Sequence, residues 1–225
     1  MSSNKTINGR SSPGLCIAFF GPDGVGKSAV IEAVKLELGS AFSAVAQFHF
    51  RPMFGRQGLD RPAVTDPHAQ LPRSRLISCA KLLYWLLDCW FGYLVVVRPA
   101  RRHSWLVIFD RYYPDVLVDP VRYRLPASAL RFARWLATLA PRLDLCVLLD
   151  APAEVVQRRK HEVSLAESQR QRLAYQAMFQ SVPAKLLVNA DAPVDEVAHE
   201  IIVAISTLLQ RSSSQPLEAP LLARS

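Results

Sequence analysis

Cysteine and histidine are scarce in this chain, and their spacing argues against several kinds of site. The four cysteines each lie in an apolar run, and none belongs to a Cys-x-x-Cys pair. The five histidines are scattered, without a His-x-x-His or Cys/His cluster. We therefore expect neither a disulfide framework nor a structural zinc site, and interpret the cysteines as reduced core residues of a cytoplasmic protein. The chain also lacks the G-x-S-x-G sequence of one class of hydrolases.

Other missing features narrow the choice of partners. The N-terminal MSSNKTINGRSSPG lacks the apolar core of a secretory signal. No basic patch with interleaved aromatic residues stands out, so a nucleic-acid partner is not expected. The net charge is nevertheless +8, and most of the positive charge is arginine. Because the arginine side chain offers a rigid fork of donors to phosphate oxygens, this composition suits an anionic ligand.

One apolar segment, residues 82–97, raises the question of a membrane span. It is shorter than the roughly 18 to 20 residues that cross a bilayer. Asp88 also interrupts it, and a carboxylate inside a membrane is costly. We therefore expect a long core helix, with a face that could pair two copies of the chain. Membrane association is the less favoured alternative.

Polar residues at both ends bracket one expected domain. Residues 1–13 are typical of a flexible leader and residues 211–225 of a disordered tail, which leaves a domain over residues 14–210. Short apolar runs predict strands at 15–20, 44–50, 105–110, 145–150 and 185–190. Helical patterns lie at 27–38, 73–97, 127–139, 152–161, 165–180 and 194–210. This alternation predicts an α/β fold with three layers, in which helices flank a five-stranded parallel sheet.

The most specific motif is GPDGVGKS, residues 21–28, which fits the phosphate-binding pattern G-x-x-x-x-G-K-[ST]. It follows the first predicted strand and opens the first predicted helix, as this motif requires. Lys27 should reach the β- and γ-phosphates of a nucleotide, and Ser28 should offer its hydroxyl to Mg²⁺. The expected nucleotide-binding residues are Gly21, Pro22, Asp23, Gly24, Val25, Gly26, Lys27, Ser28 and Ala29.

Further charged residues follow the predicted strands, at the edge of the sheet where ligands bind in this architecture. Asp110 and Arg111 end the third strand in FDRYYPD. A carboxylate opposite a phosphate loop suits coordination of Mg²⁺ and its water, whereas a local surface ion pair is the alternative. Arg51 follows the second strand. It could grip an acceptor phosphate, or it could be an exposed loop arginine.

A third basic group follows the fourth predicted strand. Arg158, Arg159 and Lys160 lie near the end of a helical pattern. They could belong to a lid, over about residues 158–170, that neutralises the charge of a transferring phosphoryl group. A solvated basic helix end would look similar. Arg170 and Arg172 either assist this lid or face solvent.

These motifs together resemble the thymidylate kinase family of P-loop nucleoside monophosphate kinases. The resemblance covers roughly residues 15–208. It rests on FFGPDGVGKS, the Arg-Pro at 51–52, the long helix ending in RPA, VIFDRYY, LLDAPAEVVQRRK, RQRLAY and VNADAPVDEVAHEI. It implies a P-loop NTPase fold, ATP and Mg²⁺ as cofactors, and transfer of the ATP γ-phosphoryl group to a nucleoside monophosphate such as dTMP. It also implies that the apolar helix pairs two copies of the chain.

The resemblance implies roles for individual residues as well. Arg51 and Arg111 would hold the acceptor phosphate, and Asp23 would face the acceptor sugar. Ser28 and Asp110 would belong to the metal site. Residues around 189–192 would lie near adenine. The expected catalytic residues are Lys27, Asp110, Arg111, Arg158 and Arg159.

Departures from the family pattern concern the acceptor side. The arginine that the family places 21 residues before the Asp of the Asp-Arg motif is Cys89 here, with Asp88 beside it. The tract DVLVDPVRYRLP replaces the family's Ala-Tyr-Gln-like stretch, and the Asp-Arg-x-Glu lid segment is missing. A substitute acceptor loop, or alternatively a local ion-pair cluster, would consist of Asp115, Asp119, Arg122, Tyr123 and Arg124.

The leading hypothesis is therefore a small-molecule phosphotransferase, in which positioning and electrostatics carry the chemistry. Its acceptor would be dTMP or another nucleotide, or alternatively a sugar or other metabolite. A nucleotide-binding regulatory protein is a second class, although no Asn-Lys-x-Asp motif for reading guanine is present. A family member that binds nucleotide without catalysis is a third.

Overall fold

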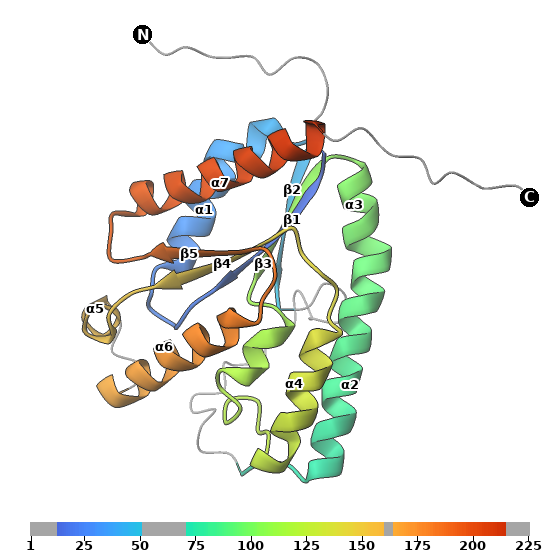
Figure 1. Cartoon of the computed structure of the whole chain (residues 1–225), viewed down its shortest axis with the longest axis vertical. Coiled ribbons are helices and arrows are strands. Elements are labelled where there is room, and N and C mark those ends of the chain that lie inside the picture. Colours follow the sequence, from blue (N-terminus) through green and yellow to red (C-terminus); the bar gives the residue numbers. More distant parts are fainter. Residues whose placement is uncertain (1–12, 51–70, 160–163, 215–225) are drawn as a thin grey trace, which may run out of the picture.

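The computed structural model describes residues 13–50, 71–159 and 164–214. Five parallel strands form one sheet in the order β2-β3-β1-β4-β5 (Figure 1). The strands are β1 (Leu15–Phe20), β2 (Ala44–His49), β3 (Trp105–Asp110), β4 (Leu145–Asp150) and β5 (Lys185–Asn189). Every residue of β1 is buried, since helices cover the central strand on both faces. This accounts for its uninterrupted apolar sequence.

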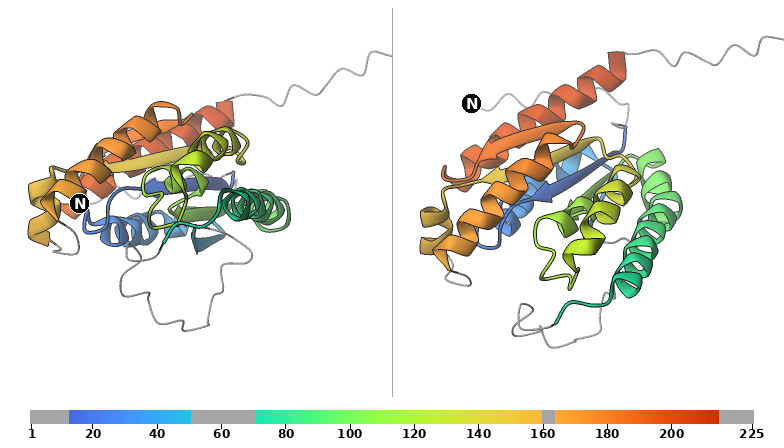
Figure 2. Two further views of the ribbon diagram at one scale, coloured as in Figure 1. Left: turned by 90° about the horizontal axis from the view of Figure 1, so that it is seen from below. Right: turned by 60° about the horizontal axis from the view of Figure 1, so that its bottom comes forward.

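Two hydrophobic cores lie on opposite faces of the sheet, because successive strand residues point to opposite sides. Ile17 and Phe19 belong to one core, with helices α1 (Lys27–Leu38) and α7 (Val194–Ser214). Ala18 and Phe20 belong to the other, with helices α2 (Arg75–Gly92), α4 (Leu130–Thr138) and α6 (Leu165–Gln180). Figures 1 and 2 show the resulting three layers. The α/β class, the three layers and the five-stranded parallel sheet are thereby confirmed.

Most element bounds agree with the prediction from the sequence. Strands β1, β3 and β4 and helices α1 and α6 begin and end at the predicted residues. The short helix α5 (Ala153–Arg159) and the 3-10 helix η4 (Tyr113–Leu117) complete the edge of the sheet that holds the candidate site. Helix α7 continues to Ser214, four residues beyond its predicted end. The expected leader and tail lie almost entirely outside the described residues.

The long helix differs most from its prediction. After α2, a π-helical turn (Tyr93–Val97) and α3 (Arg98–Arg102) continue the same helical stretch. The N–H of Arg98 donates to the Tyr93 carbonyl, five residues earlier. Pro99 follows directly, and a proline in a regular α-helix would lack an N–H and clash with the preceding turn. The wider π turn accommodates it, so the helix continues where the sequence was expected to end it.

This stretch, Arg75–Arg102, is 28 residues long and apolar enough to cross a membrane by length and composition alone. The argument that the segment is too short to span was therefore wrong, because the helix begins earlier and ends later than assumed. The finding is weak evidence for a membrane, since a core helix of a globular protein passes the same test. One side of α2 is indeed buried, including Leu82, Trp85 and Cys89.

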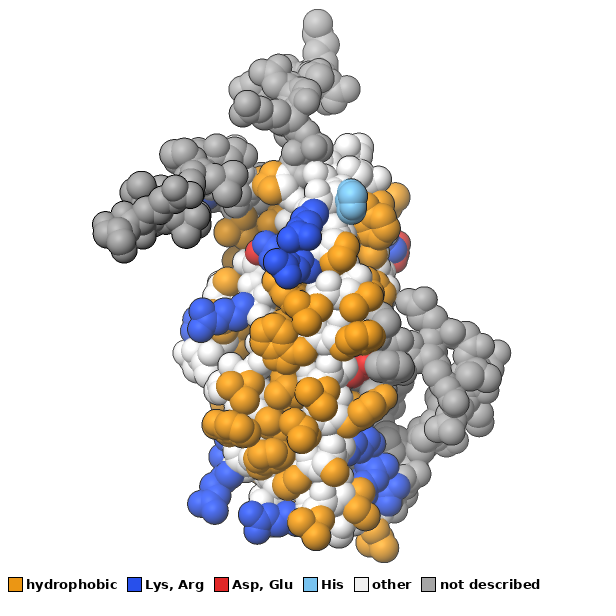
Figure 3. Space-filling view, turned by 90° about the vertical axis from the view of Figure 1, so that its right-hand side faces the viewer, with side chains coloured by type: hydrophobic (Ala, Val, Ile, Leu, Met, Phe, Trp, Pro, Cys, Tyr) orange, Lys and Arg blue, Asp and Glu red, His pale blue; other side chains and the backbone are white. Residues whose placement is uncertain are grey.

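The opposite side of the long helix carries an exposed apolar face. Its hydrophobic side chains gather along the surface in Figure 3, with Lys and Arg side chains near both ends. Nine of them are between 41% and 82% exposed: Leu76, Ile77, Leu83, Tyr84, Leu87, Trp90, Phe91, Leu94 and Val95. Contiguous apolar surface of this kind is typical of an interaction site.

Candidate active site

The phosphate loop joins β1 to α1 at the carboxyl end of the central strand. Gly21 and Gly26 have φ values of +145° and +102°, a region that favours glycine. A Cβ atom on Gly21 would lie 2.8 Å from the carbonyl oxygen of Leu149, closer than a side chain tolerates. Gly26 precedes α1 and has no side chain to cap the helix. The N–H groups at the start of α1 are thus available to an anion, as in other phosphate sites.

Lys27 lies in the floor of this loop. Its side chain is 8% exposed, and Nζ donates to the Gly21 carbonyl at 3.1 Å. Burial lowers the pKa of Lys27, and repulsion by Arg111 adds to that effect, while the carboxylates of Asp110 and Asp23 oppose it. A buried ammonium group with a single carbonyl partner among the printed hydrogen bonds is suited to an incoming phosphate.

Asp110 ends β3 beside Lys27. Its Oδ2 lies 3.4 Å from Nδ1 of His49, at the end of the neighbouring strand. Oδ1 is buried without a hydrogen-bond partner in the described part of the chain. Although burial opposes ionisation, the hydrogen bond from His49 and the charge of Lys27 hold the pKa of Asp110 below its usual value. An ionised, partly unsatisfied carboxylate facing a phosphate loop has the chemistry of a Mg²⁺ ligand.

Within the described residues, no group of three or more His, Cys, Asp or Glu side chains could hold a metal ion by itself. This agrees with the way proteins bind Mg²⁺, through one or two protein oxygens, waters and substrate phosphates. The oxygens on offer here are the exposed Ser28 hydroxyl at the start of α1 and the Asp110 carboxylate. These residues fit such a shared site.

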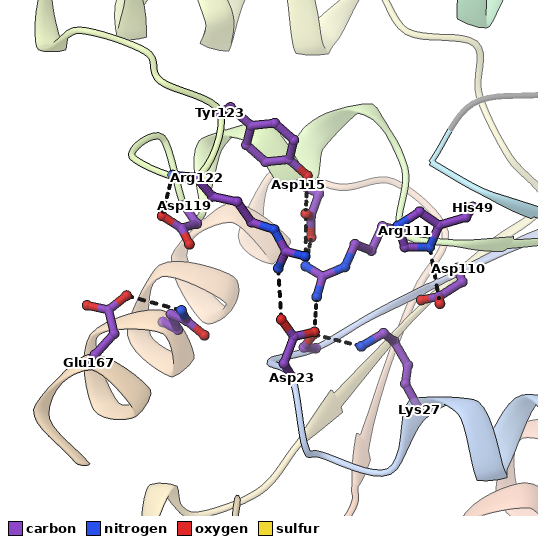
Figure 4. A network of polar contacts seen from close by, with 12 residues as sticks. Asp23, Lys27, His49, Asp110, Arg111, Asp115, Asp119, Arg122, Tyr123 and Glu167 are labelled. Atoms are coloured by element: carbon purple, nitrogen blue, oxygen red, sulfur yellow. Dashed lines mark hydrogen bonds and ion pairs between the residues drawn. The ribbon is translucent and has the colours of Figure 1, made fainter. Parts of the chain in front are cut away.

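A clamp of two arginines and one carboxylate lies opposite Lys27 (Figure 4). One oxygen of Asp23 accepts from Arg111 Nη2, and the other accepts from Arg122 Nη1 at 2.8 Å. Asp23 belongs to the phosphate loop, whereas Arg111 and Arg122 follow β3. Burial raises the pKa of Asp23, but Arg111, Arg122 and Lys27 more than compensate and lower it to about 2. Asp23 is therefore fully ionised at neutral pH.

Asp115 lies behind the clamp and not at its open side. Its side chain is 1% exposed and accepts hydrogen bonds from Arg111 Nη1 at 3.0 Å, Tyr175 at 2.7 Å and Tyr123 at 2.9 Å. It was expected among the acceptor-binding residues. The structure instead surrounds it with Arg111 and two tyrosines, because the 3-10 helix η4 turns it inward. The sequence analysis gave Tyr175 no role, although RQRLAY was among the quoted motifs.

The basic residues after β4 have separate surroundings. Arg159 Nη1 donates to the carbonyls of Val25 at 3.1 Å and Ala190 at 2.8 Å, so it ties the phosphate loop to the end of β5. Arg158 is exposed. Arg172 forms two 2.8 Å hydrogen bonds with Asp150, at the end of β4. Of these residues, Arg159 is the one that lines the cleft beside Lys27.

Several other expected residues lie apart from the clamp. Arg170 pairs with Glu167 at 2.6 Å and donates to the Val118 carbonyl. Arg124 is expected on the acceptor side, but its Nε donates to the Leu71 carbonyl at 2.9 Å at the surface. Arg51 and Lys160 lie outside the described residues.

The cleft between loop and clamp has a volume of about 310 Å³. It brings together residues from three segments of the chain that the sequence analysis proposed independently, and adds His49, which that analysis did not assign. Its lining consists of Asp23, Gly24, Gly26, Lys27, Ser28, Ala29, His49, Asp110, Arg111, Arg122 and Arg159.

A glycine-rich loop with a buried lysine, facing arginines across a parallel sheet edge, defines a P-loop phosphotransferase site. The chain matches no protein-family model. It is 30% identical over 211 residues to a thymidylate kinase of Leifsonia xyli, covering 84% of this chain and 93% of that protein. It is 28% identical over 200 residues to a thymidylate kinase of Xanthomonas campestris, covering 85% and 84%. A probable thymidylate kinase of Pyrococcus abyssi is 32% identical over 119 residues, 49% of this chain and 56% of that protein.

The chain therefore belongs to the thymidylate kinase family, and it is a kinase.

Proposed function

We propose that this kinase transfers the γ-phosphoryl group of ATP, with Mg²⁺, to a nucleoside monophosphate, and that dTMP is its acceptor. The observation that carries the proposal is the cleft in which Lys27 of the phosphate loop faces Arg111 and Arg122. Donor and acceptor phosphates both need positive charge, and here the two sources of charge share one cavity. The thymidylate kinases among its relatives support the choice of acceptor.

On the donor side, residues 21–29 would wrap the ATP phosphates, with Lys27 at the β- and γ-phosphates. Ser28 and Asp110 would hold Mg²⁺ together with the phosphates and waters. The bound ion would neutralise charge on the phosphate oxygens and orient them. Arg159 would support the loop through the Val25 carbonyl and place its remaining donors beside the transferring group. Arg158, at the exposed end of α5, would approach on closure of the lid.

On the acceptor side, Arg111 and Arg122 would bind the acceptor phosphate, with Arg51 as a third candidate. An acceptor phosphate oxygen is already ionised, so it can attack the γ-phosphorus without a general base. The bond from the γ-phosphorus to the bridging oxygen breaks, and ADP leaves. The chain's contribution is to hold the two phosphates in line and to collect the developing charge.

One observation favours a second candidate, an acceptor other than dTMP. Cys89 stands where the resembled family has an arginine for the thymine nucleotide, and its side chain is 1% exposed in the core. Phe50, Trp85 and Tyr123 pack against one another nearby, with ring centroids 5.5 to 5.7 Å apart. An arginine contact to a base is therefore absent from that position, and a different nucleotide or a non-nucleotide acceptor is the alternative.

The test is ADP release by the purified protein with ATP and Mg²⁺, over nucleoside monophosphates, nucleosides and sugars. The proposal expects dTMP to give the largest kcat/KM. The Lys27→Ala variant is the control for contaminating kinases. Release that is stimulated by another acceptor and not by dTMP would replace the acceptor; release without any acceptor would contradict the phosphotransferase assignment.

We also propose that the exposed apolar face of the long helix pairs two copies of the chain. Its nine exposed hydrophobic side chains and its straight, continuous helix support a helix-packed homodimer. Light scattering after size exclusion measures the mass directly. A monomer at micromolar concentration would contradict the dimer.

A further inference from the structure

Arg111 is held in a backbone conformation that its own side chain does not favour. Its φ is +70°, in the left-handed region that non-glycine residues seldom adopt. The backbone N–H of Arg111 donates to the Phe19 carbonyl at 3.0 Å, which ties this turn to the strand before the phosphate loop. Such strain persists only when surrounding contacts hold the residue in place. The side-chain contacts of Arg111 therefore show what supports it.

The two terminal nitrogens of Arg111 have different surroundings. Nη2 bonds the carboxylate of Asp23, whose side chain is 42% exposed. Nη1 bonds Asp115, which is 1% exposed, and the hydroxyl of Tyr175, which is 2% exposed. One edge of the guanidinium thus faces the cleft, where a ligand could replace Asp23. The other edge is bound by buried groups that no ligand reaches.

Tyr175 links the two buried partners. Its hydroxyl accepts from Arg111 Nη1 at 2.9 Å and donates to Asp115 Oδ1 at 2.7 Å. Burial raises the pKa of Tyr175 well above its usual value, and the nearby Asp115 carboxylate adds to that effect, so the hydroxyl keeps its proton and remains a donor. Arg111, Asp115 and Tyr175 therefore form a closed triangle of hydrogen bonds, in which each side chain restricts the other two.

The helix that carries Tyr175 is itself anchored to the sheet. Arg172, one turn before it on α6, forms two 2.8 Å hydrogen bonds with Asp150 at the end of β4. Gln176 donates to the same carboxylate at 3.1 Å. Tyr175 is thus presented from a fixed position, which suits a residue that orients another.

We propose that Tyr175 is a positioning residue for the acceptor clamp, which fixes the inner edge of Arg111 together with Asp115 so that its outer edge meets the acceptor phosphate. The inference rests on the proposed function for the identity of the acceptor. It does not rest on it for the state of Arg111, which can be observed directly.

The experiment compares Tyr175→Phe with two matched variants of the full chain. Tyr113→Phe is the control, because Tyr113 is equally buried, donates one hydrogen bond to the Leu82 carbonyl at 2.9 Å, and does not touch Arg111 through its hydroxyl. Tyr123→Phe is the intermediate case, because it removes a hydrogen bond to Asp115 and none to Arg111. All three lose one buried hydroxyl and should lose comparable stability.

We expect Tyr175→Phe to lower kcat/KM for dTMP about tenfold, the effect of one hydrogen bond to a charged group. The KM for ATP should change less than twofold, since Lys27 and its loop are untouched. Tyr123→Phe should show a smaller loss, and Tyr113→Phe should stay within twofold of the wild type. Equal values for Tyr175→Phe and Tyr113→Phe would overturn the proposal. If Tyr175→Phe does not fold, a Tyr123→Phe enzyme that matches Tyr113→Phe would overturn it.

A second measurement is independent of the acceptor. The guanidinium N–H signals of Arg111 in ¹H–¹⁵N spectra, assigned by their loss in Arg111→Lys, report on how firmly the side chain is held. They should be sharp in the wild type and in Tyr113→Phe, and broadened in Tyr175→Phe. Unchanged signals in Tyr175→Phe would refute the positioning role. A wild type that ignores dTMP but shows the expected broadening would refute the acceptor and leave the positioning role supported.

Discussion

Replacement of Asp23 by Asn gives a prediction whose size follows from the clamp. The pKa of Asp23 is about 2 in the folded protein against an ordinary 3.8. Since each pKa unit is worth about 1.4 kcal/mol, the difference corresponds to at most about 2.4 kcal/mol of folding free energy. The side chain is 42% exposed, so solvent screening reduces this to about 1 kcal/mol.

The pH dependence follows from the sign of the shift. Because the folded pKa is the lower one, the unfolded chain binds the proton more readily between pH 4 and pH 2. The stabilisation is complete above about pH 5, falls to about half near pH 3, and is lost below about pH 2. The Asn side chain cannot titrate, so the difference in stability between wild type and variant should shrink over this range.

Urea unfolding at pH 7, 5 and 3 measures that difference. We expect the wild type to be about 1 kcal/mol more stable than Asp23→Asn at pH 7 and about half as much at pH 3. Asp191→Asn, at an exposed turn, controls for the loss of one negative charge. A difference that is the same at pH 7 and pH 3, or one reproduced by Asp191→Asn, would refute the assignment of this stability to the clamp.

Three further predictions concern the loop and the long helix. Lys27→Ala should lower kcat about 100- to 1,000-fold in the ADP-release assay, because a preorganised charge at the transferring group is lost; a loss below tenfold would contradict its role. Gly21→Ala should destabilise the fold by about 1–3 kcal/mol in urea unfolding, because its Cβ would press on Leu149. Gly39→Ala, with no atom within 4 Å of its Cβ, should be neutral or slightly stabilising; equal losses would refute the steric argument. Leu87→Glu, on the exposed helix face, should convert the proposed dimer to a monomer in light scattering without loss of helix content by circular dichroism.

The sheet could be predicted from the sequence because each central strand is an uninterrupted apolar run between two covering layers. LCIAFF is buried at every position, so its hydrophobicity carries both its location and its parallel neighbours. The long helix was harder, since Pro99 ordinarily marks a helix end. Only the tertiary contacts of the following turn show that a π turn carries the helix to Arg102.

The candidate site divides in the same way. The loop glycines and Lys27 form a local motif whose flanking strand and helix follow in sequence, so their placement could be predicted. The orientation of Asp115 could not. Four residues separate it from Arg111, and that spacing alone suits either an ion pair or a shared acceptor contact. Tyr175, 60 residues further along, completes its inward environment, and no local pattern connects the two.

The composition of the clamp has a consequence for how an anion enters. Six ionisable groups surround the cleft or stand directly behind it, three cationic and three anionic: Lys27, Arg111, Arg122, Asp23, Asp110 and Asp115. Their formal charges cancel, although the whole chain carries +8. A phosphate that reaches Arg111 and Arg122 must therefore take the place of the Asp23 carboxylate. Binding at such a site is an ion exchange within the protein, which would disfavour simple anions that cannot also supply the contacts Asp23 gives up.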